Sequence, residues 1–195
     1  MYNSLGDFMS DILKNSFKLF LSVLFATFAS FMITISFAAI FAKSSLCLFY
    51  VLTQFFNIIV LITLVWQNTY HIGFKDSNMV RTGHKTEDLY TGFKIGIIAQ
   101  IPWLIFLIVS FIFNIRFGVY RIINSTYWSF LTLISGSIRT EKITVLKMCD
   151  LGALKSIEFG ALLLIVPIIS GFVYILGYKG IDIFSNVVYK RKKGE

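Results

Sequence analysis

Three amide side chains lie inside long uncharged stretches of this sequence. Gln54 and Asn57 are three residues apart, so a helix would place both on one face. Gln100 belongs to a later uncharged stretch. An amide in apolar surroundings needs a hydrogen-bond partner, because leaving it unpaired costs free energy. These residues predict either polar contacts between helices or a binding site for a small polar molecule.

A second candidate set combines both histidines of the chain with two carboxylates: His71, Asp76, His84 and Asp88. His84 and Asp88 are four residues apart, a spacing that suits two ligands of a divalent metal on one helix. No third histidine or cysteine lies nearby, so we expect no metal ion and no cofactor. His-Glu-x-x-His and Gly-x-Ser-x-Gly do not occur either, and we do not expect an enzyme.

Small residues recur at every fourth position along the first uncharged stretch. The series is Ser22, Ala26, Ser30, Thr34, Ala38 and Ala42. Helices in lipid associate where small side chains let their backbones approach closely. The series therefore predicts a packing face, either within the protein's own bundle or against a separate membrane subunit.

Four uncharged stretches are each about as long as a membrane-spanning helix. They cover residues 19–42, 46–66, 95–114 and 159–178. Crossing a hydrocarbon core of about 30 Å takes about 20 apolar residues. Charged residues make up only 14% of the chain, whereas soluble domains contain about 25%. We predict an all-α, polytopic transmembrane helix bundle that forms one domain over residues 1–195, with 1–18 as an amphipathic lead-in.

Two further segments set the details of this bundle. Residues 117–136 place Arg121 beside Tyr120 and Tyr127, a composition typical of the membrane interface. This marginal segment either spans weakly, enters the bilayer and returns, or lies flat. The polar stretch 67–94 predicts a connector with a turn at 76–78. We therefore predict four firm spans plus one marginal or re-entrant segment.

The distribution of basic residues predicts orientation. The net charge is +8, and four adjacent basic residues occupy positions 190–193. Such a cluster is best placed facing the anionic inner leaflet of a membrane. We expect both termini in the cytoplasm, a location in the cell membrane, and the lipid bilayer as a partner. No soluble domain carries a basic face, so we expect no nucleic-acid partner.

Several short patterns resemble those of small uncharacterised polytopic membrane proteins of Gram-positive bacteria. They are Gly73-x-Lys75-Asp76-x-Asn78-x-Val80-x-x-Gly83, Gly92-x-Lys94-x-Gly96, Pro102, and Gly177-Tyr178-Lys179-Gly180 before the basic tail. The resemblance implies a bacterial cytoplasmic membrane and no particular activity. The chain length and the first helix are also similar to substrate-binding subunits of energy-coupling-factor vitamin transporters, which have six spans.

The leading hypothesis is an accessory or substrate-binding subunit of a membrane transport or secretion assembly, with other membrane subunits as partners. The first alternative is a stand-alone small-molecule permease that uses Gln54, Asn57 and Gln100. The second is a subunit of the energy-coupling-factor type. The four uncharged stretches contain no Asp, Glu or His, which disfavours proton-driven transport.

Overall fold

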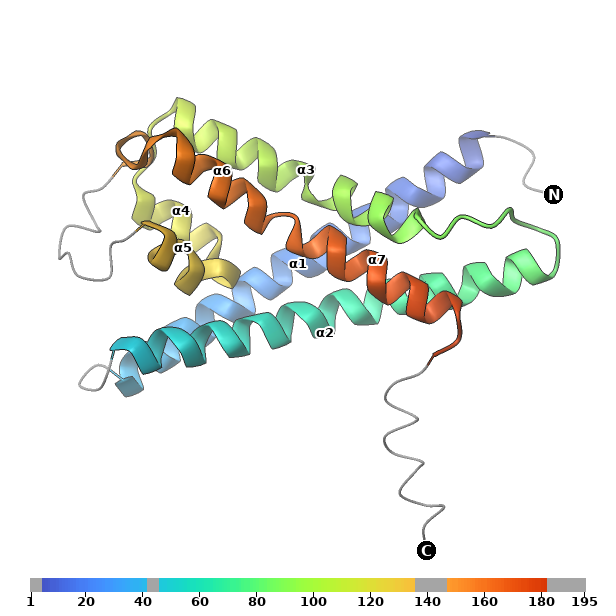
Figure 1. Cartoon of the computed structure of the whole chain (residues 1–195), viewed down its shortest axis with the longest axis horizontal. Coiled ribbons are helices and arrows are strands. Elements are labelled where there is room, and N and C mark those ends of the chain that lie inside the picture. The colour runs from blue at the N-terminus through green and yellow to red at the C-terminus, as the bar shows by residue number, and fades with distance from the viewer. Residues whose placement is uncertain (1–4, 42–45, 136–146, 182–195) are drawn as a thin grey trace, which may run out of the picture.

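The computed structural model of the chain describes residues 5–41, 46–135 and 147–181. The elements are α1 (Leu5–Phe41), α2 (Leu46–Arg81), α3 (Thr91–Ile112), α4 (Phe117–Ile123), the 3-10 turn η1 (Ser125–Tyr127), α5 (Trp128–Ser135), the 3-10 turn η4 (Met148–Leu151), α6 (Gly152–Leu162) and α7 (Ile165–Tyr178). No strand forms within the described residues, and the predicted all-α fold is confirmed (Figure 1).

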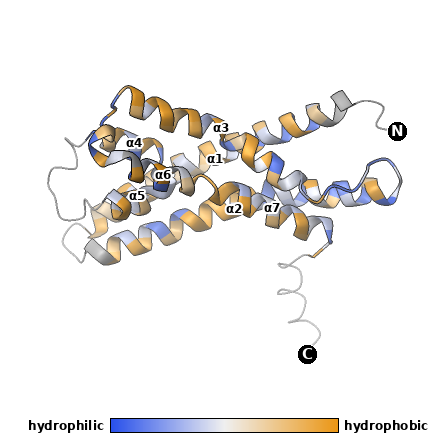
Figure 2. Cartoon of the chain, turned by 45° about the horizontal axis from the view of Figure 1, so that its top comes forward, coloured by the Kyte–Doolittle hydropathy of each residue, from blue (hydrophilic) through white to orange (hydrophobic). Residues whose placement is uncertain are grey.

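Four helical stretches are long and apolar enough to cross a membrane. They are Met9–Phe41, Leu48–Arg81, Thr91–Ile112 and Leu154–Tyr178, the last made of α6 and α7 together. Hydrophobic residues predominate along α3, while hydrophilic residues gather in the loop that follows α2 (Figure 2). The chain is thus built as a multi-pass membrane protein with four candidate spans, as predicted.

Large apolar side chains cover the outside of these helices. Phe25 and Phe28 of α1, Ile105 of α3 and Phe172 of α7 each expose more than half of their surface. Water would make such a large exposed apolar surface unfavourable, whereas acyl chains would solvate it. The outer surface of the bundle is therefore suited to contact with lipid.

The first two helices are much longer than a bilayer requires. With 37 and 36 residues, α1 and α2 each extend about 55 Å at 1.5 Å per residue, against a hydrocarbon core of about 30 Å. They run antiparallel, so the start of α1 and the end of α2 lie at the same end of the molecule (Figure 1).

The turn predicted at residues 76–78 was wrong, because these residues belong to the last part of α2. Asp favours turns when its side chain bonds to nearby backbone groups. In the structure the Asp76 carboxylate instead accepts hydrogen bonds from Lys85 and from the Tyr174 hydroxyl. Because these tertiary contacts occupy the carboxylate, it does not bond to the nearby backbone and compete with helix formation.

The last span was predicted as residues 159–178 and is longer and interrupted. The candidate span begins at Leu154 within α6, and α6 and α7 are separated by Leu163 and Leu164. Pro167 has no amide hydrogen, and its ring clashes with the carbonyl of the residue four positions earlier, which is Leu163. The break therefore lies where the proline prevents regular helical bonding. In α3, by contrast, the helix continues through Pro102.

Glycines allow α7 to contact α2 at backbone distance. A Cβ atom added to Gly73 of α2 would lie 2.2 Å from the carbonyl oxygen of Tyr174, and one added to Gly177 of α7 would lie 2.2 Å from that of Tyr70. No real Cβ atom tolerates such distances. The two helices therefore pack backbone against backbone, as small residues permit in membranes.

The α3–α7 contact depends on glycines in the same way. A Cβ atom on Gly96 would lie 2.6 Å from Cα of Pro167, and one on Gly92 would lie 2.3 Å from Cβ of Tyr174. The Ser170 hydroxyl also donates a 2.7 Å hydrogen bond to the carbonyl of Gly92. The last span is thus held between α2 and α3.

We expect Gly73→Ala and Gly177→Ala to destabilise the fold, because each added methyl group would meet a backbone atom of the facing helix. Overpacking of this kind typically costs about 1–3 kcal/mol. Thermal unfolding of the purified protein in detergent should show a lower midpoint for both variants.

Gly160→Ala is the matched control, since the nearest atom to its added Cβ would be Cδ2 of Leu107, 3.8 Å away. Its midpoint should equal or exceed that of the unsubstituted protein, because alanine favours helix. Equal midpoints for all three variants would contradict the predicted close packing.

Candidate functional site

Residues 117–135 form a re-entrant segment that enters the bundle and returns to the same end. It consists of α4, η1 and α5, of which α4 has 7 residues and α5 has 8. Helices of these lengths extend about 10–12 Å, too short to cross a core of about 30 Å. Figure 1 shows both helices near the end of the molecule where α1 finishes and α2 begins. The short helices disfavour a weak span, whereas entry into the bilayer and return, as opposed to lying flat, stays a prediction.

The turn of this segment lies deep among the spans. It contacts Asn57, which is about 17 Å along α2 from the first residue of that helix. That distance is about half the thickness of the hydrocarbon core. On the α1 side the turn contacts Thr27, well inside the first uncharged stretch. The turn η1 therefore lies about halfway along the uncharged stretches of α1 and α2.

Side chains of α1 and α2 hold the turn through a polar network. Gln54 Nε2 donates to the carbonyl of Thr126 at 3.1 Å, and Asn57 Nδ2 donates to the carbonyl of Ser125 at 3.1 Å. The Ser125 hydroxyl donates to the carbonyl of Thr27 at 2.5 Å, and the hydroxyls of Thr27 and Thr126 are 3.2 Å apart. Backbone groups that are not helical are tolerated at this depth only when protein satisfies them.

Several buried polar atoms around the turn have no partner among the described residues. They include Gln54 Oε1, Asn57 Oδ1, the hydroxyl of Tyr127 and that of Ser129. All four side chains are more than nine-tenths buried. Each buried group without a partner costs about 1–3 kcal/mol, and four such groups lie around this turn.

Arg121 contributes a positive charge to the same region. The residue is only 4% exposed, and its guanidinium carbon lies 4.1 Å from the ring centre of Trp128 and 5.6 Å from that of Phe117. The Tyr50 hydroxyl of α2 lies beside the guanidinium. Arginine is well suited to stacking on aromatic faces, and an ionisable residue buried within a bundle of apolar helices is a candidate for function.

Aromatic stacking fixes α4, and with it Arg121, between two spans. The rings of Phe106 in α3 and Tyr120 are nearly parallel with centres 5.8 Å apart, and Phe117 stacks on Phe159 of α6 at the same distance. The sequence-based interpretation of Tyr120 and Tyr127 as interfacial was wrong, because both are buried inside the protein.

A pocket with a volume of about 350 Å³ opens between the second and third turns of α2 and the helix α5. It is lined by Tyr50, Val51, Gln54, Phe55, Ser129, Phe130 and Leu133. Most of this lining is apolar, and the unpaired atoms of Gln54 and Ser129 belong to the lining residues. Small-molecule sites typically combine such a volume with a few placed polar groups. We call it the embedded pocket.

The other predicted residues are distributed differently. Gln100 does not join Gln54 and Asn57: it is buried on α3, and both atoms of its amide are unpaired within the described part of the chain. Sequence reasoning did not single out Ser125 or Ser129. The one signal available for them was a run of small polar residues inside an aromatic segment.

The small-residue series of α1 faces its own bundle over most of its length. The structure buries Ala26, Ser30 and Thr34. Ser22 accepts a 2.8 Å hydrogen bond from Asn68 of α2, whereas Ala38 is exposed. Ala42 lies outside the described residues. A separate subunit would therefore reach this face only near Ala38.

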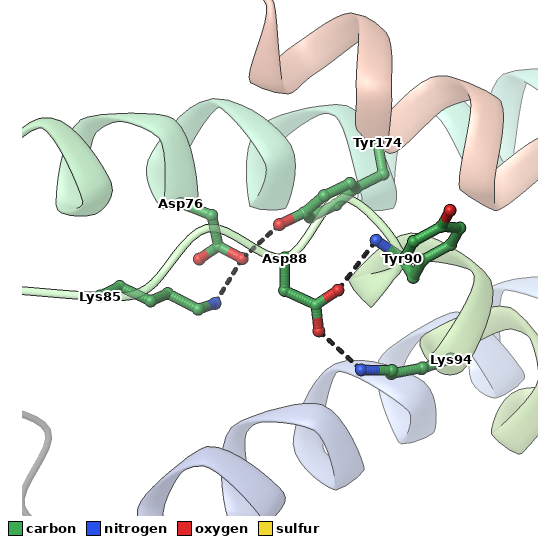
Figure 3. Close-up of polar contacts among 6 residues, drawn as sticks. All are labelled: Asp76, Lys85, Asp88, Tyr90, Lys94 and Tyr174. Carbon is green, nitrogen blue, oxygen red and sulfur yellow. Dashed lines mark hydrogen bonds and ion pairs between the residues drawn. The ribbon is translucent and has the colours of Figure 1, made fainter.

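The predicted histidine and carboxylate set does not assemble. Asp76 binds Lys85 and Tyr174 instead of a histidine (Figure 3). Its Oδ2 atom lies 2.5 Å from Nζ of Lys85 and 2.9 Å from the hydroxyl oxygen of Tyr174. His71 and His84 are both exposed, and the latter lies in the loop between α2 and α3 rather than on a helix with Asp88. No group of three His, Cys, Asp or Glu residues that suits a metal ion occurs in the described ranges.

Asp88 instead stabilises the start of α3. Its carboxylate accepts hydrogen bonds from the backbone amide of Tyr90 at 3.0 Å and from Lys94 Nζ at 2.6 Å (Figure 3). Burial raises the pKa of Asp88, but the bonds from Lys94 and Tyr90 outweigh it, so the pKa lies below its ordinary value. A carboxylate near the N-terminus of a helix also interacts favourably with the helix dipole.

Comparison with known proteins gives no relative for this arrangement. No protein-family model, no curated protein and no solved structure matches the chain. The functional assignment of the embedded pocket therefore depends on the geometry of its own residues.

Proposed function

We propose that this chain is a non-enzymatic membrane protein that binds a small solute in the embedded pocket, as the substrate-binding subunit of a membrane transport assembly. The observation that carries the proposal is a pocket of about 350 Å³ beside the turn η1, lined by Gln54 and Ser129. Gln54 Oε1 and Ser129 Oγ are buried just behind its apolar wall and have no partner among the described residues. Discontinuous helices near mid-membrane form the solute sites of many transporters.

The lining of the pocket indicates the chemistry of the solute. Its walls are mainly apolar, which favours a partly hydrophobic molecule with one or two polar groups. Tyr50 both lines the pocket and lies beside the buried Arg121. The positive charge of Arg121 would repel a cation in these low-dielectric surroundings. The proposed solute is therefore neutral or anionic.

The role as a subunit follows from what the spans lack. The four uncharged stretches carry no Asp, Glu or His that would couple solute movement to protons. Energy for transport would then come from a partner in the assembly. The proposed orientation places both termini in the cytoplasm of a bacterial cell, because of the basic residues at 190–193.

The pocket should be open to water-soluble reagents. We expect Ser129→Cys, in a chain with Cys47→Ser and Cys149→Ser, to react with anionic sulfonatoethyl methanethiosulfonate in proteoliposomes. Ser129 lines the pocket but is only 1% exposed, so its thiol would ionise and react only where the pocket admits water. Ile59→Cys is the matched control, because this exposed residue of α2 is not part of the pocket lining. Reaction is followed by mass spectrometry, and equal inertness of both thiols would exclude a solute pocket at this place.

Arg121 should set the charge preference of that reaction. We expect the anionic reagent to modify Ser129→Cys at least about fivefold faster than cationic trimethylammonium-ethyl methanethiosulfonate, since about 1 kcal/mol of electrostatic preference gives such a ratio. Arg121→Gln should remove the preference and Arg121→Lys should keep it. Arg116→Gln, an equal loss of charge at the exposed start of α4, should leave it unchanged. A preference that survives Arg121→Gln would contradict the proposed role of this charge.

The same thiol distinguishes a binding subunit from a stand-alone permease. Solutes that slow the labelling of Ser129→Cys identify ligands, and one such radiolabelled solute is then offered to liposomes that contain only this protein. The proposal expects bound solute without flux. Sustained flux that is lost on Gln54→Leu would favour the permease alternative instead.

A further inference from the structure

A second cavity lies at the other end of the molecule, where the start of α1 and the end of α2 extend beyond the uncharged stretches. Its volume is about 300 Å³, roughly ten times the liquid volume of a water molecule. Four lysines line it: Lys14, Lys18, Lys75 and Lys85. Asp11, Asp76 and His71 complete the ionisable lining. We call it the basic cavity.

The charge of the basic cavity is positive. Four lysines against two aspartates give a formal net charge of +2 with His71 neutral. Asp76 is already engaged by Lys85 and by the Tyr174 hydroxyl. Within the described ranges Lys14, Lys18 and Lys75 form no ion pair, so three ammonium groups remain to attract an anion.

Helical spacing brings these groups to the cavity from two sides. Lys14 and Lys18 are one turn apart on α1, and His71 and Lys75 are one turn apart on α2. The amides of Asn15 and Gln67 line the same cavity. Ammonium and amide groups facing one another present many hydrogen-bond donors, and lysine is a frequent phosphate-binding residue.

The depth of the cavity is that of lipid headgroups. Lys18 directly precedes the uncharged stretch that begins at Leu19, and His71 follows the stacked rings of Trp66 and Tyr70, whose centres are 5.6 Å apart. Aromatic residues at the end of a span mark the interface between membrane and water. A cavity at this level meets the phosphates of the surrounding lipids.

An apolar stripe beside the cavity favours a lipid over a soluble anion. Met9, Leu13 and Phe17 of α1 lie one turn apart and expose 52%, 57% and 60% of their surfaces. Leu13 and Phe17 each directly precede a cavity lysine, so the stripe lies about 100° around the helix from Lys14 and Lys18. A phosphate held by the lysines would thus have acyl chains placed against apolar side chains.

We propose that the basic cavity binds a phosphate group, and that its source is the headgroup of an anionic phospholipid. This site is separate from the embedded pocket. Bound lipid would connect the ends of α1 and α2 to the loop that carries Lys85.

The test measures binding of phosphatidylglycerol to the purified full-length protein by native mass spectrometry. The variant Lys14→Gln/Lys75→Gln removes two cavity charges. The control Arg81→Gln/Lys179→Gln removes two charges from exposed residues at the same end that do not line the cavity. Each lysine near an anionic surface contributes about fivefold to affinity. We expect the cavity variant to bind phosphatidylglycerol about 25-fold more weakly. The affinity of the control variant should fall by less than about twofold.

Two further measurements separate the sources of phosphate. If inorganic phosphate and glycerophosphoglycerol at millimolar concentration fail to displace the lipid, the headgroup assignment is supported. If the cavity lysines control binding of inorganic phosphate but not of the lipid, the phosphate site is supported and its lipid source is overturned. If both double variants lose lipid affinity equally, while their thermal unfolding midpoints in detergent stay unchanged, the proposal as a whole is overturned.

Discussion

A turn near the middle of a bilayer needs its backbone carbonyls and amides satisfied by protein, because lipid offers no hydrogen bonds. In this chain Gln54 and Asn57 meet that requirement by donating to the carbonyls of Thr126 and Ser125. Without these donors the carbonyls of Thr126 and Ser125 would lose the side-chain hydrogen bonds that they accept from α2. The buried position of Arg121, the embedded pocket and the unpaired polar atoms near it all depend on the turn remaining there.

The helices around the turn are positioned by contacts of a different kind. Glycines at 73, 92, 96 and 177 let α7 lie between α2 and α3 at backbone distance, and stacked rings hold α4 between α3 and α6. This close packing contributes dispersion energy that lipid cannot replace. It also brings the Tyr174 hydroxyl to Asp76, which is one of the residues that line the basic cavity. The two candidate sites at opposite ends of the bundle thus share one scaffold.

The sequence was sufficient to predict the four spans, since uncharged apolar stretches of about 20 residues are typical of membrane-spanning helices and rare in soluble domains. It also indicated that Gln54 and Asn57 share a face that needs polar partners. It did not show that these partners are backbone carbonyls of residues 125 and 126. That contact joins segments about 70 positions apart, and no local pattern encodes it. Composition alone likewise misplaced Tyr120 and Tyr127 at the interface, because buried and interfacial aromatic residues look alike in a sequence.

We propose that residues 117–135 enter the membrane and return to the same side. Single cysteines at Arg116 and Lys147, which flank this part of the chain, test it most directly in right-side-out and inverted vesicles of a cysteine-free chain. The structure predicts that a membrane-impermeant maleimide labels both positions from one side, and labels a cysteine at Lys85 only from the other. Labelling of positions 116 and 147 from opposite sides would show that the segment crosses the bilayer and would rule out entry and return.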